Sequence, residues 1–131
     1  MPWRPDQALA TDRGIYVAVY DLAEATQLVI GALGAIELAA GRYLYVGSAQ
    51  RHLLSRLRRH ARREKSRRWH MDYLAAHGVM RGAWVLPGAP KHRECEVAAT
   101  LSTSYVRPVS GFGSSDCQCE SHLFWMPASE S

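Results

Sequence analysis

The chain lacks a hydrophobic run long enough to cross a membrane. Its longest apolar stretch, residues 28–40, is interrupted by Gly31, Gly34 and Glu37, whereas a membrane helix needs about 20 consecutive apolar residues. The first six residues also lack the apolar segment that follows the charge in a signal peptide. We therefore expect a cytoplasmic protein with no membrane partner.

Cysteine is scarce, with Cys95, Cys117 and Cys119 the only three in 131 residues. An odd number in a cytoplasmic chain argues against a disulfide framework, so we expect buried, reduced thiols. A zinc site formed by these cysteines and His122 is an alternative. The Cys-x-Cys spacing is tighter than the usual gap between zinc ligands, which favours the thiols.

No internal repeat is visible, and 131 residues suffice for one domain with its own core. The prolines near the N-terminus and the absence of periodicity there predict a flexible lead-in over residues 1–12. We expect a single domain over residues 13–127.

Positive charge is concentrated in one segment. Residues 51–68 hold eight Arg and one Lys against Glu64, a net charge of +8 in a chain of net charge +4, so the remainder carries −4. Concentrated arginine on a small domain is the electrostatic footprint of a phosphate-rich partner. The sequence therefore favours nucleic acid as the partner, either DNA or RNA.

Glycines and β-rich runs predict a small sheet. Residues 14–20 alternate so that Ile15, Val17 and Val19 share one face of a strand and Tyr16, Ala18 and Tyr20 share the other. Residues 27–30 and 35–38 predict a β-hairpin with glycines in its turn. Further strands are expected over residues 42–46 and 81–86, and the run 122–126 predicts an edge strand.

Three helices are expected among these strands. The first follows the strand 42–46 and has an apolar arc, formed by Leu53, Leu54, Leu57 and Ala61. Arg56, His60 and Arg63 lie on one flank of that arc, partly desolvated and still reachable, where a phosphate-binding arginine would sit, although solvated helix charges are the simpler interpretation. The second helix is expected from Ser66 to about His77, and the third over residues 91–104.

Two tripeptides carry a family resemblance. Gly14-Ile15-Tyr16 and Tyr45-Val46-Gly47 resemble the two halves of the signature of the GIY-YIG nuclease superfamily, and the helix phrase of residues 54–60 follows the second half directly. The chain is most similar to the Uri-type branch. The phrases that resemble this branch are Gly31–Gly34, Tyr45–Ala49, Trp69–Leu74, Gly111–Cys117 and Ser121–Leu123.

The resemblance implies an α/β (α+β) domain with a small antiparallel sheet flanked by helices, to which this chain adds the β-hairpin. It implies a divalent-metal-dependent endonuclease that hydrolyses phosphodiester bonds in DNA. In such enzymes the tyrosine matching Tyr45 helps to deprotonate the attacking water, with the one matching Tyr16 beside it. The arginine matching Arg56 contacts the scissile phosphate, and a glutamate on the last helix holds Mg²⁺ or Mn²⁺.

We place this metal ligand at Glu94, because Val97, Ala98 and Leu101 follow at spacings that set it beside a buried stripe. Glu96 is the reserve, since residues two apart lie on different faces of a helix. One carboxylate is enough for Mg²⁺, which keeps several waters as ligands.

The remaining site residues are basic. His60 either packs at the edge of the core or donates to phosphate, and we include it among the catalytic residues. His70 is a nucleic-acid contact, a support for other site residues or a packing residue. The residues that we assign to nucleic-acid binding are Arg51, Arg59, Arg63, Arg67 and His70.

Each site residue could also have a purely structural role. Tyr16 and Tyr45, for example, lie in predicted strands, where tyrosine is common. The alternative to an endonuclease is therefore a non-catalytic nucleic-acid-binding module of the same fold. An interaction domain held by a metal ion at the cysteines is a third hypothesis.

Overall fold

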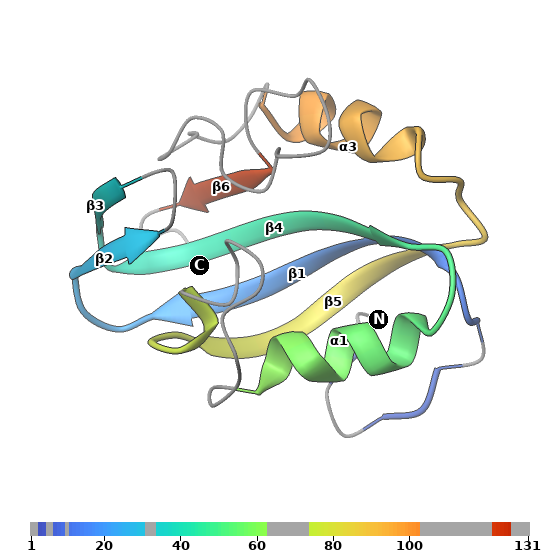
Figure 1. Ribbon diagram of the computed structural model, residues 1–131, viewed down its shortest axis with the longest axis horizontal. Coiled ribbons are helices and arrows are strands. Elements are labelled where there is room, and N and C mark those ends of the chain that lie inside the picture. The colour runs from blue at the N-terminus through green and yellow to red at the C-terminus, as the bar shows by residue number, and fades with distance from the viewer. Residues whose placement is uncertain are drawn as a thin grey trace.

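The centre of the molecule is a four-stranded antiparallel sheet with the strand order β5-β1-β4-β6 (Figure 1). The computed structural model describes residues 3–4, 7–9, 11–30, 34–62, 74–102 and 122–126. The strands of this sheet are β1 (Gly14–Leu22), β4 (Gly41–Ala49), β5 (Val79–Pro87) and β6 (Leu123–Met126). Strand β6 lies at one edge of the sheet, which confirms the predicted edge strand.

A separate hairpin extends from one end of this sheet (Figure 1). It consists of β2 (Thr26–Ile30) and β3 (Gly34–Leu38), which pair only with each other within the described residues. Gly34 has a φ of 74°, a left-handed conformation that favours glycine at the end of a turn. The predicted hairpin is confirmed, and residues 31–33 of its turn lie outside the described residues.

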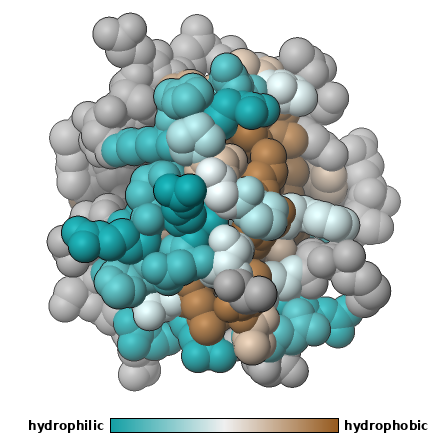
Figure 2. Space-filling model, turned by 90° about the vertical axis from the view of Figure 1, so that its right-hand side faces the viewer, coloured by the Kyte–Doolittle hydropathy of each residue, from teal (hydrophilic) through white to brown (hydrophobic). Residues whose placement is uncertain are grey.

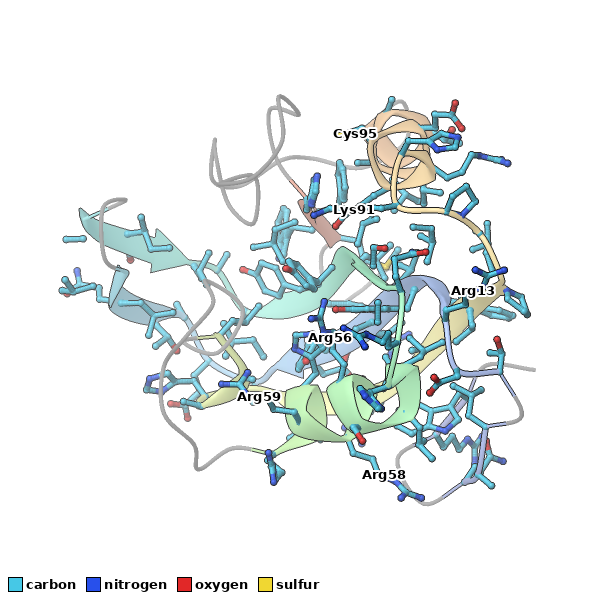
Figure 3. The ribbon with its side chains drawn as sticks, turned by 45° about the vertical axis from the view of Figure 1, so that its right-hand side comes forward. Arg13, Arg56, Arg58, Arg59, Lys91 and Cys95 are labelled. Carbon is cyan, nitrogen blue, oxygen red and sulfur yellow. The ribbon has the colours of Figure 1, made fainter. Side chains whose placement is uncertain are left out.

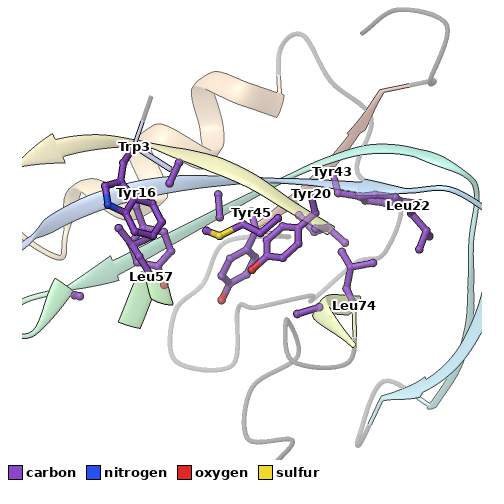
Figure 4. Close-up of a cluster of buried hydrophobic side chains, with 14 of the residues drawn as sticks. Trp3, Tyr16, Tyr20, Leu22, Tyr43, Tyr45, Leu57 and Leu74 are labelled. Atoms are coloured by element: carbon purple, nitrogen blue, oxygen red, sulfur yellow. The ribbon is translucent and has the colours of Figure 1, made fainter. Parts of the chain in front are cut away.

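Helices α1 (Leu53–Ala61) and α3 (Arg93–Ser102) cover opposite faces of the sheet. Leu53 and Leu57 of α1 share a buried cluster with Tyr16 and Tyr20 of β1, and Figure 4 shows the aromatic rings of this cluster. A second cluster on the other face is smaller, and joins Ile15, Val17, Val46, Phe124 and Ala98. The predicted alternation along β1 therefore separates two cores, and the α+β fold is confirmed.

The second predicted helix is described only at its end. Leu74 and Ala75 are helical, and the backbone N–H of Gly78 donates to the Leu74 carbonyl at 2.9 Å. Residues 63–73, over which most of this helix was predicted, lie outside the described residues. In the part of the chain that is described, no helix is long and apolar enough to span a membrane.

Trp3 lies within residues 1–12, the predicted flexible lead-in, and it pairs with the sheet. Its backbone N–H and carbonyl both bond to Ala83 of β5, at 2.7 and 2.8 Å, and its indole lies in the core beside α1. The paired carbonyl lies 2.4 Å from where a Cβ on Gly82 would stand. A single β-bridge is too short to produce a periodic pattern, so the first residues give no sequence signal of it.

Asp21 joins three strands through two arginines. Its carboxylate accepts bonds from Nε of Arg42 on β4 and from Nε of Arg81 on β5, both at 2.8 Å. The hydrogen bond from Arg42 is the largest cause that lowers the pKa of Asp21, and the bond from Arg81 lowers it further. The charged form of Asp21 is therefore favoured by the folded state.

We expect Asp21→Asn to lower the free energy of unfolding at pH 7 by about 1 kcal/mol, because the side chains are partly exposed. The folded-state pKa is depressed, so this stability is present above the unfolded pKa near 4 and is lost as pH falls through the folded pKa. Urea denaturation at pH 7 and at pH 2 measures the difference between variant and wild type, which should shrink at low pH. Glu24→Gln removes an exposed carboxylate as the control, and an equal loss there would contradict the assignment.

Candidate functional site

The site is built on the contact between Tyr16 and Gly47. These residues face each other across the β1–β4 pair, and a Cβ on Gly47 would lie 2.4 Å from both Cζ and Oη of Tyr16. Only glycine leaves room for the phenol to lie across β4. The glycine of Tyr45-Val46-Gly47 is therefore required by the tyrosine of Gly14-Ile15-Tyr16.

His60 links this phenol to helix α1. Its Nε2 lies 2.7 Å from Oη of Tyr16, and both side chains are buried. The hydroxyl of Tyr20 donates to the backbone carbonyl of His60 at 2.9 Å. Two tyrosines of β1, both on the face that α1 covers, therefore hold the last turn of α1 in place.

Tyr45 contacts His60, and Arg56 contacts the residue that follows Gly47. The Tyr45 ring meets the His60 ring edge-on, with centroids 5.7 Å apart. Nη1 of Arg56 donates to the carbonyl of Ser48 at 2.5 Å, directly after Gly47. Figure 3 shows Arg56 directed from α1 toward β4, whereas Arg58 lies on the outer side of the helix.

Glu94 enters from the other helix. It lies in the first turn of α3 and is 8% exposed, and its Oε1 lies 3.4 Å from Nδ1 of the buried His122. Glu96 is exposed and forms an ion pair with Arg93. Of the two predicted carboxylates, Glu94 is the one that faces inward, as the spacing of the apolar residues indicated.

Several of these side chains shift the pKa of the Tyr16 hydroxyl. Burial raises the pKa of the Tyr16 hydroxyl well above its usual value, Tyr45 raises it next, and the positive charge of Arg56 lowers it. Tyr20 and Glu94 add smaller increases. Residues from β1, β4, α1 and α3 thus act on one hydroxyl, which is protonated at neutral pH.

This arrangement combines a proton-transfer pair with a cation and a carboxylate. Oη of Tyr16 and Nε2 of His60 lie at hydrogen-bond distance, 2.7 Å apart, so a proton can pass between them. A guanidinium suits phosphate oxygens, and a carboxylate suits a hard divalent cation. The arrangement is therefore suited to chemistry on a phosphate ester.

The described residues fit a metal ion only with a single protein carboxylate. Among them, no group of three or more His, Cys, Asp or Glu could hold a metal ion. The near-buried Glu94 carboxylate is an oxygen donor of the type that Mg²⁺ and Mn²⁺ prefer. It fits a site in which water and substrate oxygens provide the other ligands.

All five residues predicted to be catalytic are described by the structure and belong to this arrangement: Tyr16, Tyr45, Arg56, His60 and Glu94. Of those predicted for nucleic-acid binding, Arg51 is exposed and Arg59 is half-buried. Arg63, Arg67 and His70 lie outside the described residues.

The surface at this end of the molecule is mixed in character. Figure 2 views the side from which α1 and α3 start, and shows hydrophilic side chains gathered next to a band of hydrophobic ones.

Sequence reasoning missed two supporting contacts. Tyr20 was assigned to a strand face without a partner for its hydroxyl, although its place two residues after Ala18 put it on the same face as Tyr16. His122 was considered only as a zinc ligand, and it lies beside Glu94 instead. Neither contact has a local sequence signal, because each joins distant parts of the chain.

Cys95 corrects the expectation of reduced thiols, because it is disulfide-bonded. The other two cysteines of the chain, Cys117 and Cys119, lie outside the described residues. A cysteine in a disulfide cannot supply a thiolate to zinc, so the four-ligand zinc site with Cys95 is also wrong. An odd number of cysteines does not by itself exclude a disulfide.

Comparison with known proteins assigns the chain to a family. The model of the family described as "Domain of unknown function DUF123" matches residues 15–131, and the chain belongs to this family. Comparison with curated proteins and with solved structures finds no match. The matched range covers all the site residues described above.

We expect Gly47→Ala to displace the Tyr16 phenol, because the new methyl group would overlap the ring. Overpacking of this kind costs about 1–3 kcal/mol of stability, which urea denaturation measures. In a Tyr16→Ala background the same change should cost much less, since the ring is gone. Equal costs in the two backgrounds would show that the Tyr16 ring does not determine the need for glycine.

Proposed function

We propose that the protein is a divalent-metal-dependent endonuclease of the GIY-YIG superfamily, in its Uri-type branch, that hydrolyses phosphodiester bonds in DNA. The observation that carries this proposal is the grouping of Tyr16, Tyr45 and Arg56 around His60 and Gly47, in which the hydroxyl of Tyr16 lies 2.7 Å from Nε2 of His60. Glu94, from the helix on the other face of the sheet, adds a buried carboxylate whose charge acts on the same hydroxyl. These are the residues that the resemblance assigns to catalysis, together with a histidine from the same helix as the arginine.

Arg56 has the role of binding the scissile phosphate. Charge builds up on the phosphoryl oxygens during hydrolysis, and a planar guanidinium neutralises it. The bond to the Ser48 carbonyl fixes the position of the guanidinium beside Gly47.

The tyrosines and His60 handle the proton of the attacking water. Tyr45 is the more exposed of the two tyrosines, at 8% against 2% for Tyr16, so its hydroxyl is better placed to orient water. Tyr16 is protonated at neutral pH, and it can pass a proton to Nε2 of His60 only as it receives another. The pair therefore moves a proton without accumulating charge on the phenol.

Glu94 would hold the metal ion at the edge of this group. Mg²⁺ or Mn²⁺ held there would supply positive charge to the reaction. The carboxylate itself contributes to the electrostatics of Tyr16, whose pKa it raises.

The test is cleavage of labelled single- and double-stranded DNA, and of RNA, with Mg²⁺ or Mn²⁺. We expect Arg56→Ala and Glu94→Gln each to reduce the cleavage rate by about 100-fold or more, the magnitude typical of removing one group that stabilises the transition state. The matched controls are Arg58→Ala, on the outer side of the same helix, and Glu96→Gln, exposed on the same helix as Glu94. Cleavage that persists unchanged in Arg56→Ala and Glu94→Gln would overturn the assignment.

The second candidate is a nucleic-acid-binding module without catalysis. The near-complete burial of both tyrosines favours it, because little of either hydroxyl is left to meet water. A module of this kind would bind through the basic segment alone.

For either function we expect binding of DNA to weaken steeply as salt rises, because arginines that contact phosphates release counterions. Fluorescence anisotropy between 50 and 200 mM salt, on the order of the range where such losses are large, measures the slope. EDTA should leave binding unchanged and should abolish only cleavage. Salt-independent binding would contradict a role for the basic segment.

A further inference from the structure

A buried histidine, His122, contacts the proposed metal ligand Glu94. His122 is 0% exposed, and its Nδ1 lies 3.4 Å from Oε1 of Glu94, whose side chain is 10% exposed. The proposed mechanism gives His122 no role. The two atoms lie within ion-pair distance, and the buried imidazole limits the directions in which the Glu94 carboxylate can turn.

The backbone of His122 is fixed to the strand that carries the site. Its carbonyl accepts the N–H of Val46 at 2.9 Å, and the next residue, Leu123, pairs with Tyr45. The imidazole therefore projects from a position that is set relative to Tyr45 and Gly47. A side chain that the imidazole orients is therefore also placed relative to the tyrosines.

Glu94 needs such a support. It stands in the first turn of α3, a helix that packs on the opposite face of the sheet from Tyr16 and α1. A glutamate side chain has several rotatable bonds, and a free carboxylate at a helix end would sample many orientations. The imidazole removes this freedom before any cation binds.

We propose that His122 is a positioning residue that holds the Glu94 carboxylate ready for the catalytic cation. The inference rests on the proposed function, in which Glu94 is the metal ligand. Partners that orient a ligating carboxylate affect metal affinity by about 10- to 100-fold when they are replaced. His122 is thus expected to determine metal affinity without touching the nucleic acid.

Two substitutions separate positioning from packing. His122→Asn keeps a side-chain amide close to the place of Nδ1, whereas His122→Phe keeps a ring of similar size without a polar atom. We expect the affinity for Mn²⁺, measured by EPR and calorimetry without nucleic acid, to be nearly retained in His122→Asn and to fall by about 10- to 100-fold in His122→Phe. His77→Phe, at an exposed histidine, is the matched control.

Cleavage kinetics provide a second readout. In His122→Phe, the rate lost at low Mn²⁺ should return with excess Mn²⁺, and KM for DNA should stay constant, which a purely structural defect would not produce. If His122→Phe does not fold, His122→Gln, whose amide is displaced by one methylene, should bind Mn²⁺ more weakly than His122→Asn.

The two proposals fail in different ways. Wild-type Mn²⁺ affinity in His122→Phe, or equal affinities in His122→Gln and His122→Asn if the former must be used, would overturn the positioning role alone. Unchanged Mn²⁺ affinity in Glu94→Gln would overturn Glu94 as the ligand, and the inference with it.

Discussion

The packing of the Tyr16 ring across Gly47 is the constraint on which the rest of the site depends. It brings a phenol from β1 over β4, and the hydroxyl then reaches His60 of α1 at 2.7 Å. Strands β1 and β4 and helix α1 are thereby joined at one point. With this contact in place, Arg56, one turn before His60 on the same helix, is directed toward the carbonyl that follows Gly47.

The two faces of the sheet carry cores of different composition. The face beneath α1 holds a large core rich in tyrosine, and the hydroxyls of Tyr16 and Tyr20 are used to hold the helix. Among the described residues, the core beneath α3 is smaller and contains aliphatic residues with Phe124. Glu94 influences a hydroxyl that belongs to the other face, so the proposed chemistry depends on both helices being correctly placed.

Much of the fold was predictable because its signals are local. Alternation along residues 14–20 and the glycines of the hairpin have periods of a few residues, and the structure confirms both. The contacts of Tyr16 with His60 and of Glu94 with His122 join distant residues, and no pattern of spacing encodes them. The bridge of Trp3 was not foreseen and Cys95 was mispredicted for related reasons, since one bridge and one disulfide leave no periodic trace in a sequence.

The pairing of Trp3 with β5 has a practical consequence for shortened forms of the chain. A truncation that starts after Trp3 would remove the partner of Ala83 and the indole that fills the core beside it. The N–H and carbonyl of Ala83 would then lose their partner on the outer strand, and unpaired groups at a sheet edge invite association between molecules. Such a fragment would be prone to aggregate even though every residue of the proposed site is still present.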